Sequence, residues 1–165
     1  MKKQCMVILV ENNAGVLARV SSLFMQRGFN IDSLTVSSTE NPRISRITIM
    51  ATGDQLTFSQ ILKQTAKLVE TKMIFSVEPS FSLIRELLMV KFNTEQADVE
   101  ALKKVIDDFG ARVIDVTSGC MVAELSAASS LIDDFLDATR SFEKIEMCRS
   151  GAIAMEQGRV AYDIN

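Results

Sequence analysis

The sequence predicts an α+β protein made of two tandem βαββαβ units. The first reason is that the same order of strand-like and helix-like patterns occurs twice along the 165 residues. The second is a short segment with a proline, Glu78–Ser82, which separates the two copies. The third is composition, because 47% hydrophobic and 24% charged residues are typical of a globular protein. A chain of this length buries roughly 70% of its unfolded surface, so each unit can form a core.

The first unit opens with an apolar run at residues 7–10, followed by a polar connection at residues 11–15. The next apolar residues are spaced as on one face of a helix, and Gly28 is expected to end that helix with a positive φ. The residues that define this helical face are Val16, Leu17, Val20, Leu23 and Phe24.

The rest of the first unit contains two further strands, a helix and a last strand. Leu34 and Val36 continue a strand, and residues 39–43 have the composition of a turn. Residues 46–51 alternate as a strand, with Ile47, Ile49 and Ala51 on one face. The unit ends with a helical pattern over residues 58–69 and a strand over residues 73–77. This order is the ferredoxin-like pattern.

The second half of the chain repeats that order. Its patterns are a strand at 87–92, a helix at 99–109 before Gly110, hairpin strands at 112–117 and 120–125, a helix at 131–136 and a strand at 143–148. Residues 150–165 have weaker periodicity and are expected to be only partly ordered. The predicted domains are therefore residues 1–78, a linker at 79–83, and residues 84–165 including this tail.

Charge and hydropathy exclude two classes of partner. The net charge of −3 and the pI of about 5.1 leave no clustered basic face for nucleic acid. No apolar run approaches the roughly 20 residues of a membrane span, and the first residues lack the apolar core of a signal peptide. We therefore expect a cytoplasmic protein with neither a nucleic-acid nor a membrane partner.

The residue types present argue against catalysis by this chain alone. There is no histidine, which is the commonest general base and metal ligand, and no nucleophile motif or phosphate-binding loop occurs. Cys5, Cys120 and Cys148 are widely spaced without a metal-ligand pattern, so we expect buried, reduced thiols. The sequence predicts no catalytic residue, no metal site and no cofactor in this chain.

The first strand is expected to be buried on both faces. Met6, Ile8 and Val10 alternate with Cys5, Val7 and Leu9, so both sides of the strand are apolar. Two helices can cover only one face of the sheet, and a large uncovered apolar face is a liability in a monomer. We therefore predict that a partner chain covers the other face, most simply in a two-fold homodimer.

The connection Glu11–Gly15 has two interpretations. It can be a plain strand-to-helix connection, with Asn13 as a cap and Gly15 relaxing the turn. It can also bind a small anion, because the first turn of a helix has N–H groups without intrahelical partners. The asparagine amides add donors and acceptors, which suits the carboxylate and ammonium groups of a free amino acid. That second interpretation requires Asn12, Gly15 and Asn30 to meet at one ligand.

Residues 10–36 read V-E-N-N-A-G-V-L-A-R-V-S-S-L-F-x-x-R-G-F-N-I-x-S-L-T-V, and this stretch resembles the N-terminal ACT domain of the regulatory small subunits of acetohydroxyacid synthase (acetolactate synthase). The resemblance continues in family order over nearly the whole chain. The further matching segments are Ser45–Ile49, Glu86–Lys91, Ile114–Thr117 and Arg149–Ala154.

The resemblance implies a non-catalytic subunit that activates a separate catalytic subunit. In this family the catalytic subunit carries thiamine diphosphate, Mg²⁺ and FAD, and the small subunit confers feedback inhibition, usually by valine. Leucine or isoleucine is the alternative effector, and a free-standing amino-acid sensor that controls a different protein is the alternative function. By residue matching, the effector-binding positions are Asn12, Gly15 and Asn30, with Asn13, Ala14, Val16, Leu17 and Ile31 as neighbours that shape the site.

Overall fold

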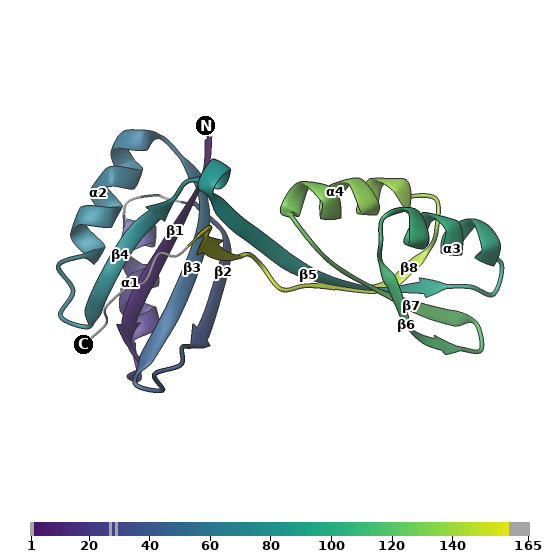
Figure 1. Ribbon diagram of the computed structural model, residues 1–165, viewed down its shortest axis with the longest axis horizontal. Coiled ribbons are helices and arrows are strands. Elements are labelled where there is room, and N and C mark those ends of the chain that lie inside the picture. The colour runs from purple at the N-terminus through teal and green to yellow at the C-terminus, as the bar shows by residue number, and fades with distance from the viewer. Residues whose placement is uncertain (1, 27, 29, 159–165) are drawn as a thin grey trace. The chain divides into compact units, whose positions relative to one another are not determined.

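The computed structural model describes residues 2–26, 28 and 30–158. Their contacts divide the chain into two compact units (Figure 1). One unit comprises the residues up to Leu83 together with the segment that begins at Ala152, and the other is Ile84–Gly151. Each unit has an antiparallel sheet and two helices, which confirms the predicted α+β class with two ferredoxin-like repeats.

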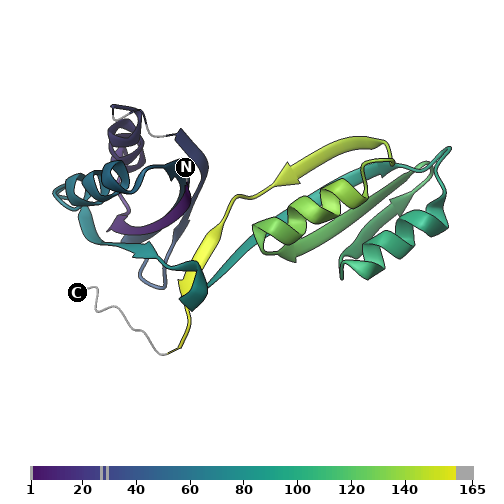
Figure 2. The ribbon, with the colours of Figure 1, turned by 90° about the horizontal axis from the view of Figure 1, so that it is seen from above.

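The first unit has a four-stranded sheet in the order β2-β3-β1-β4. Both of its helices lie on the same face of this sheet (Figure 2). Gly28 follows α1 with φ +64°, which confirms the predicted helix end. The elements are β1 (Lys2–Glu11), α1 (Val16–Gln26), β2 (Asn30–Ser38), β3 (Ile44–Gly53), α2 (Gln55–Thr65) and β4 (Thr71–Val77).

The core of the first unit lies between the sheet and these helices. The face of β3 predicted to be apolar, Ile47, Ile49 and Ala51, is in this core. Asp54 begins α2 by accepting a hydrogen bond from the Thr57 N–H at 2.8 Å, and its hydrogen bonds with Thr57 lower the pKa of the Asp54 carboxyl. The buried residues of this core are Met6, Ile8, Val10, Val16, Val20, Phe24, Ile47, Ile49, Ala51, Phe58 and Ile61.

The second unit repeats the arrangement with the strand order β6-β7-β5-β8. Its two helices pack on the sheet through Leu102, Ile106, Ile132 and Phe135, all of which are buried. The elements are β5 (Ser82–Asn93), α3 (Val99–Asp108), β6 (Arg112–Thr117), β7 (Cys120–Ala127), α4 (Ser129–Ala138) and β8 (Lys144–Arg149).

The segments at the expected domain boundaries differ from the sequence-based ranges. The expected linker 79–83 consists of a short 3₁₀ helix, η1 (Pro79–Phe81), and the start of β5. The expected second domain, 84–165, includes residues that contact the first unit, because β9 (Ile153–Glu156) lies against β4 and the Gln157 N–H donates to the Phe81 carbonyl at 2.9 Å. β9 also pairs with β5. Residues 159–165 of the expected tail lie outside the described residues.

The C-terminal segment, residues 152–158, lies against the face of the first sheet that the helices leave open (Figure 2). Arg46 on β3 donates from Nη2 to the Ala154 carbonyl at 2.6 Å, and Ala152 and Ala154 are both buried. On this face of β1, Cys5 and Leu9 are only 3% and 1% exposed. The strand is therefore buried on both faces within a single chain, and this burial alone does not require a partner chain.

The three cysteines differ in exposure. Cys5 is buried as expected, whereas Cys120 is half-buried and Cys148 is exposed. The expectation of three buried thiols is therefore wrong for Cys148, because β8 is the edge strand of the second sheet. Burial raises the pKa of the Cys5 thiol to about 11, and the charge of Arg46 opposes that shift.

Thiol reactivity should report whether the C-terminal segment covers Cys5. In a Cys120→Ser/Cys148→Ser background at pH 8, we expect Cys5 to react with a disulfide reagent about 100-fold more slowly than an ordinary thiol, since the thiolate is the reacting species. Truncation after Gly151 should accelerate the reaction at least ~10-fold, with circular dichroism checking that the fold is retained. Equal rates with and without the segment would contradict this assignment.

Candidate functional site

The connection between β1 and α1 is a tight elbow. β1 ends at Glu11 and α1 begins at Val16, and Gly15 between them has φ +85°, a conformation that favours glycine. Apart from the adjoining residues of the chain, no atom lies within 4 Å of the position that a Cβ would occupy on Gly15. The Arg19 N–H donates to the Gly15 carbonyl at 3.1 Å. Leu17 and Ala18 come before Arg19 in the first turn, where backbone N–H groups have no intrahelical acceptor. These N–H groups can therefore donate to an anion.

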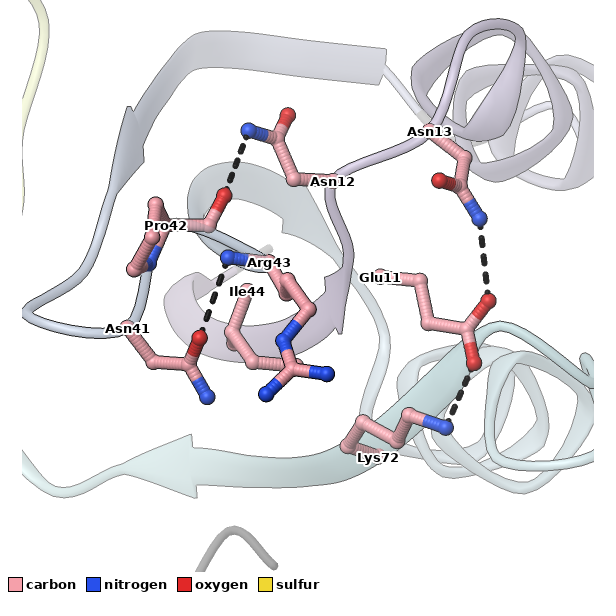
Figure 3. A pocket seen from close by; sticks show the side chains of 8 residues that line it. All are labelled: Glu11, Asn12, Asn13, Asn41, Pro42, Arg43, Ile44 and Lys72. Atoms are coloured by element: carbon pink, nitrogen blue, oxygen red, sulfur yellow. Dashed lines mark hydrogen bonds and ion pairs between the residues drawn. The ribbon is translucent and has the colours of Figure 1, made fainter.

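Asn12 attaches this elbow to the turn between β2 and β3. Its backbone N–H donates to the Arg43 carbonyl at 2.8 Å, and its side-chain Nδ2 donates to the Pro42 carbonyl at 3.0 Å (Figure 3). In the turn itself, the Arg43 N–H donates to Asn41 Oδ1 at 3.1 Å. The elbow and the turn therefore form one hydrogen-bonded structure at this end of the sheet.

A second set of polar contacts lies on the other side of the elbow. Asn13 Nδ2 donates to Glu11 Oε2 at 3.0 Å, and Lys72 at the start of β4 forms an ion pair with Glu11 Oε1 at 2.6 Å (Figure 3). The Val16 N–H contacts the backbone carbonyl of Asn13 at 3.4 Å. The Asn13 side chain thus bonds to Glu11, and the start of α1 is contacted by the Asn13 backbone carbonyl rather than by its side chain.

These segments surround an open pocket of about 580 Å³ at the end of the sheet (Figure 3). Of the residues predicted from the sequence, Asn12 and Asn13 line it. Ala14 and Gly15 are exposed on the elbow and Leu17 is exposed in the first turn of α1, whereas Val16 is buried in the core. The lining residues are Glu11, Asn12, Asn13, Asn41, Pro42, Arg43, Ile44 and Lys72.

Asn30 and Ile31 lie at the opposite end of the sheet. Asn30 is paired with Thr52, eight residues along β3 from Ile44, which is paired with Glu11 at the elbow. At roughly 3.3 Å per residue, this separation is about 26 Å. Ile31 packs against the core, and Asn30 Nδ2 contacts Asp32 Oδ1 at 3.4 Å. One chain therefore does not bring Asn30 to Asn12 and Gly15.

Sequence reasoning missed the contributions of the turn and of β4 to the pocket. The motif Asn41-Pro42-Arg43 was interpretable only as a turn, and Lys72 precedes an ordinary alternating strand. Their positions depend on strand pairing between β1, β3 and β4, which no local signal reveals.

Among the described residues, no three His, Cys, Asp or Glu side chains are arranged to hold a metal ion. In the same part of the chain, none of the helices has the length and apolar character needed to cross a membrane.

Two tandem βαββαβ units, with a polar pocket at the first strand-to-helix elbow, define an ACT-like protein. Comparison with protein-family models supports this class for both units. The model of the AHAS small subunit-like ACT domain matches residues 6–72, and the model of the small subunit of acetolactate synthase matches residues 85–158.

Individual relatives match over nearly their whole length. The probable acetolactate synthase small subunit of Methanothermobacter thermautotrophicus is 38% identical, over 91% of this chain and 90% of the relative. The acetolactate synthase isozyme 3 small subunit of Escherichia coli is 36% identical, over 94% of this chain and 96% of the relative. The crystal structure of the acetolactate synthase small subunit from Thermotoga maritima superposes with a TM-score of 0.88 and 32% identity, over 97% of this chain and all of that one. The chain belongs to the acetolactate synthase small-subunit family.

Proposed function

We propose that this chain is the regulatory subunit of an acetolactate synthase. In this proposal it activates a separate catalytic subunit and allows a branched-chain amino acid, valine first, to inhibit that enzyme. The observation that carries the proposal is the match to acetolactate synthase small subunits across both units, over residues 6–72 and 85–158. The chain itself contributes no catalytic group, and thiamine diphosphate, Mg²⁺ and FAD belong to the catalytic partner. The complex works in the cytoplasm.

The effector site of this proposal is shared between two copies of the chain. The start of α1 offers the first-turn amides of Leu17 and Ala18 to a carboxylate, and Asn12 belongs to the elbow that precedes this helix. Asn30 of the same chain is about 26 Å away along the sheet. A two-fold axis that places two α1 helices side by side and antiparallel would bring the elbow of one copy to Asn30 and Ile31 of the other.

Exposed apolar side chains on α1 support such a homodimer. Leu17 and Met25, at the two ends of the helix, are 42% and 76% exposed in the single chain. Burial of these side chains against a second copy would remove apolar surface from water, at about 25 cal/mol per Å². Valine bound across such an interface can regulate the enzyme only if it favours one arrangement of the protomers over another.

Mixing experiments test the subunit role. Addition of the full chain to the acetolactate synthase catalytic subunit from the same source should raise acetolactate production, and the two proteins should co-elute on size exclusion. Valine should then reduce the stimulated rate, because a coupling of about 1–3 kcal/mol corresponds to roughly 5- to 150-fold in affinity. A chain that neither stimulates nor co-elutes with the catalytic subunit would refute the proposal.

A further inference from the structure

We infer that Arg43 is the residue that binds the carboxylate of the effector, and that Asn12 is a positioning residue that holds Arg43 at the elbow. The inference rests on the proposed function, because it assigns a role within the same site. It adds a residue from the turn between β2 and β3 to a site that the sequence assigned only to the elbow and to the start of β2.

The charges that line the pocket leave one cationic group available. Glu11 and Lys72 neutralise each other across 2.6 Å, and Asn13 also donates to the Glu11 carboxylate. Within the described part of the chain, the Arg43 guanidinium forms no hydrogen bond or ion pair, although it lines the pocket. The side chain is exposed and points into the space between Asn41 and Lys72 (Figure 3). The pocket therefore offers one unpaired positive charge, which suits a ligand with a single negative charge.

The backbone that carries Arg43 is fixed from both sides. On the turn side, Asn41 Oδ1 accepts the Arg43 N–H at 3.1 Å, and the Asn41 carbonyl accepts the Ile44 N–H at 2.9 Å. On the elbow side, Asn12 donates to the carbonyls of Arg43 and Pro42. Asn12 thus uses side-chain and backbone donors on the turn. Its amide oxygen is an acceptor suited to the ammonium group of an amino acid.

A guanidinium is well matched to this task. It stays charged at any physiological pH and presents parallel N–H donors that fit the two oxygens of a carboxylate. Arg43 would thus supply paired N–H donors to the carboxylate of a ligand that enters this pocket. A branched-chain amino acid that lost its carboxylate would therefore lose the larger part of its recognition.

Calorimetry with valine and valinol tests the assignment on the full chain. Valinol keeps the ammonium group and the side chain of valine but carries a hydroxymethyl group in place of the carboxylate. Arg43→Gln removes the charge while it leaves the backbone bonds of the turn in place. Arg140→Gln, which alters an exposed arginine in the second unit by the same charge, is the matched control.

We expect Arg43→Gln to weaken valine binding about 10-fold or more, since hydrogen bonds to charged groups account for factors of this size. Valinol binding should stay within about two-fold of the unmodified chain, and Arg140→Gln should bind both compounds normally. Arg43→Lys should recover only part of the loss, because a lysine lacks the paired donors.

Two results would overturn the inference alone. Valine affinity that stays within two-fold in Arg43→Gln would show that the guanidinium is merely solvated, and an equal loss for valine and valinol would show that Arg43 only supports the fold. A third result, in which the unmodified chain binds no branched-chain amino acid, would overturn the effector part of the proposed function and this inference with it.

Discussion

Gly15→Asp should abolish inhibition by valine while the chain still activates the catalytic subunit. The space around Gly15 is open, with no atom beyond the adjoining residues within 4 Å of a Cβ position, and aspartate tolerates a positive φ better than most residues. The fold is therefore expected to survive. The new carboxylate would lie next to the first-turn amides that the effector uses and would repel the carboxylate of valine. Two like charges about 4 Å apart cost about 4 kcal/mol at an effective dielectric of 20, which corresponds to at least ~100-fold in affinity.

Gly15→Asn is the matched control for this prediction. Asparagine has the size of aspartate and adopts positive φ readily, but it carries no charge. We expect it to keep valine affinity within about 10-fold of the unmodified chain, so that charge and shape are separated. Both variants are measured by valine titration of acetolactate production in the reconstituted complex. Normal valine inhibition of the Gly15→Asp complex would place the effector site away from this elbow.

The secondary structure was predictable because most of its elements leave periodic patterns. The helix at Val16–Gln26 buries one face, and the strand at Ile44–Gly53 turns the apolar face of Ile47, Ile49 and Ala51 to the core, so the spacing of these apolar residues predicts both elements. β9 could not be predicted in the same way, because four residues are too few to define a period. Its partner strand, β5, is also distant in sequence. Only the folded chain shows that β9 contacts the first sheet, through the hydrogen bond from Arg46 to the Ala154 carbonyl.

The candidate site was predictable only where it is local. Asn12 and Gly15 stand out because a polar elbow with a glycine interrupts an apolar strand and a helix. Arg43 lies at the pocket because the next residue, Ile44, pairs with Glu11. The register of that pairing depends on the whole sheet, so it could not be predicted locally. The separation of about 26 Å between the elbow and Asn30 has the same origin, because α1 runs the chain from one end of the sheet to the other.

The second unit contains a partly buried charge cluster that no sequence pattern indicated. Glu86 on β5 is 7% exposed and accepts from Arg149 Nε at the end of β8 and from the Ser129 hydroxyl at the start of α4. Arg149 Nη1 also forms an ion pair with Asp133 at 2.7 Å. Although burial works against the charged guanidinium, hydrogen bonds and the charges of Glu86 and Asp133 raise the pKa of Arg149. The cluster joins β5, β8 and α4.

Arg149→Met should lower the free energy of unfolding of the second unit by about 3 kcal/mol, because it leaves the Glu86 carboxylate buried without its partner. Arg140→Met breaks an ion pair with Asp137 that is exposed on both sides, and it should cost at most about 0.5 kcal/mol. Adding Glu86→Gln to Arg149→Met should restore part of the loss, because the double variant no longer buries an unpaired charge. Urea unfolding of the full chain measures all three variants. An Arg149→Met variant no less stable than Arg140→Met would contradict this prediction. It would mean that water hydrogen-bonds the Glu86 carboxylate as effectively as Arg149 does.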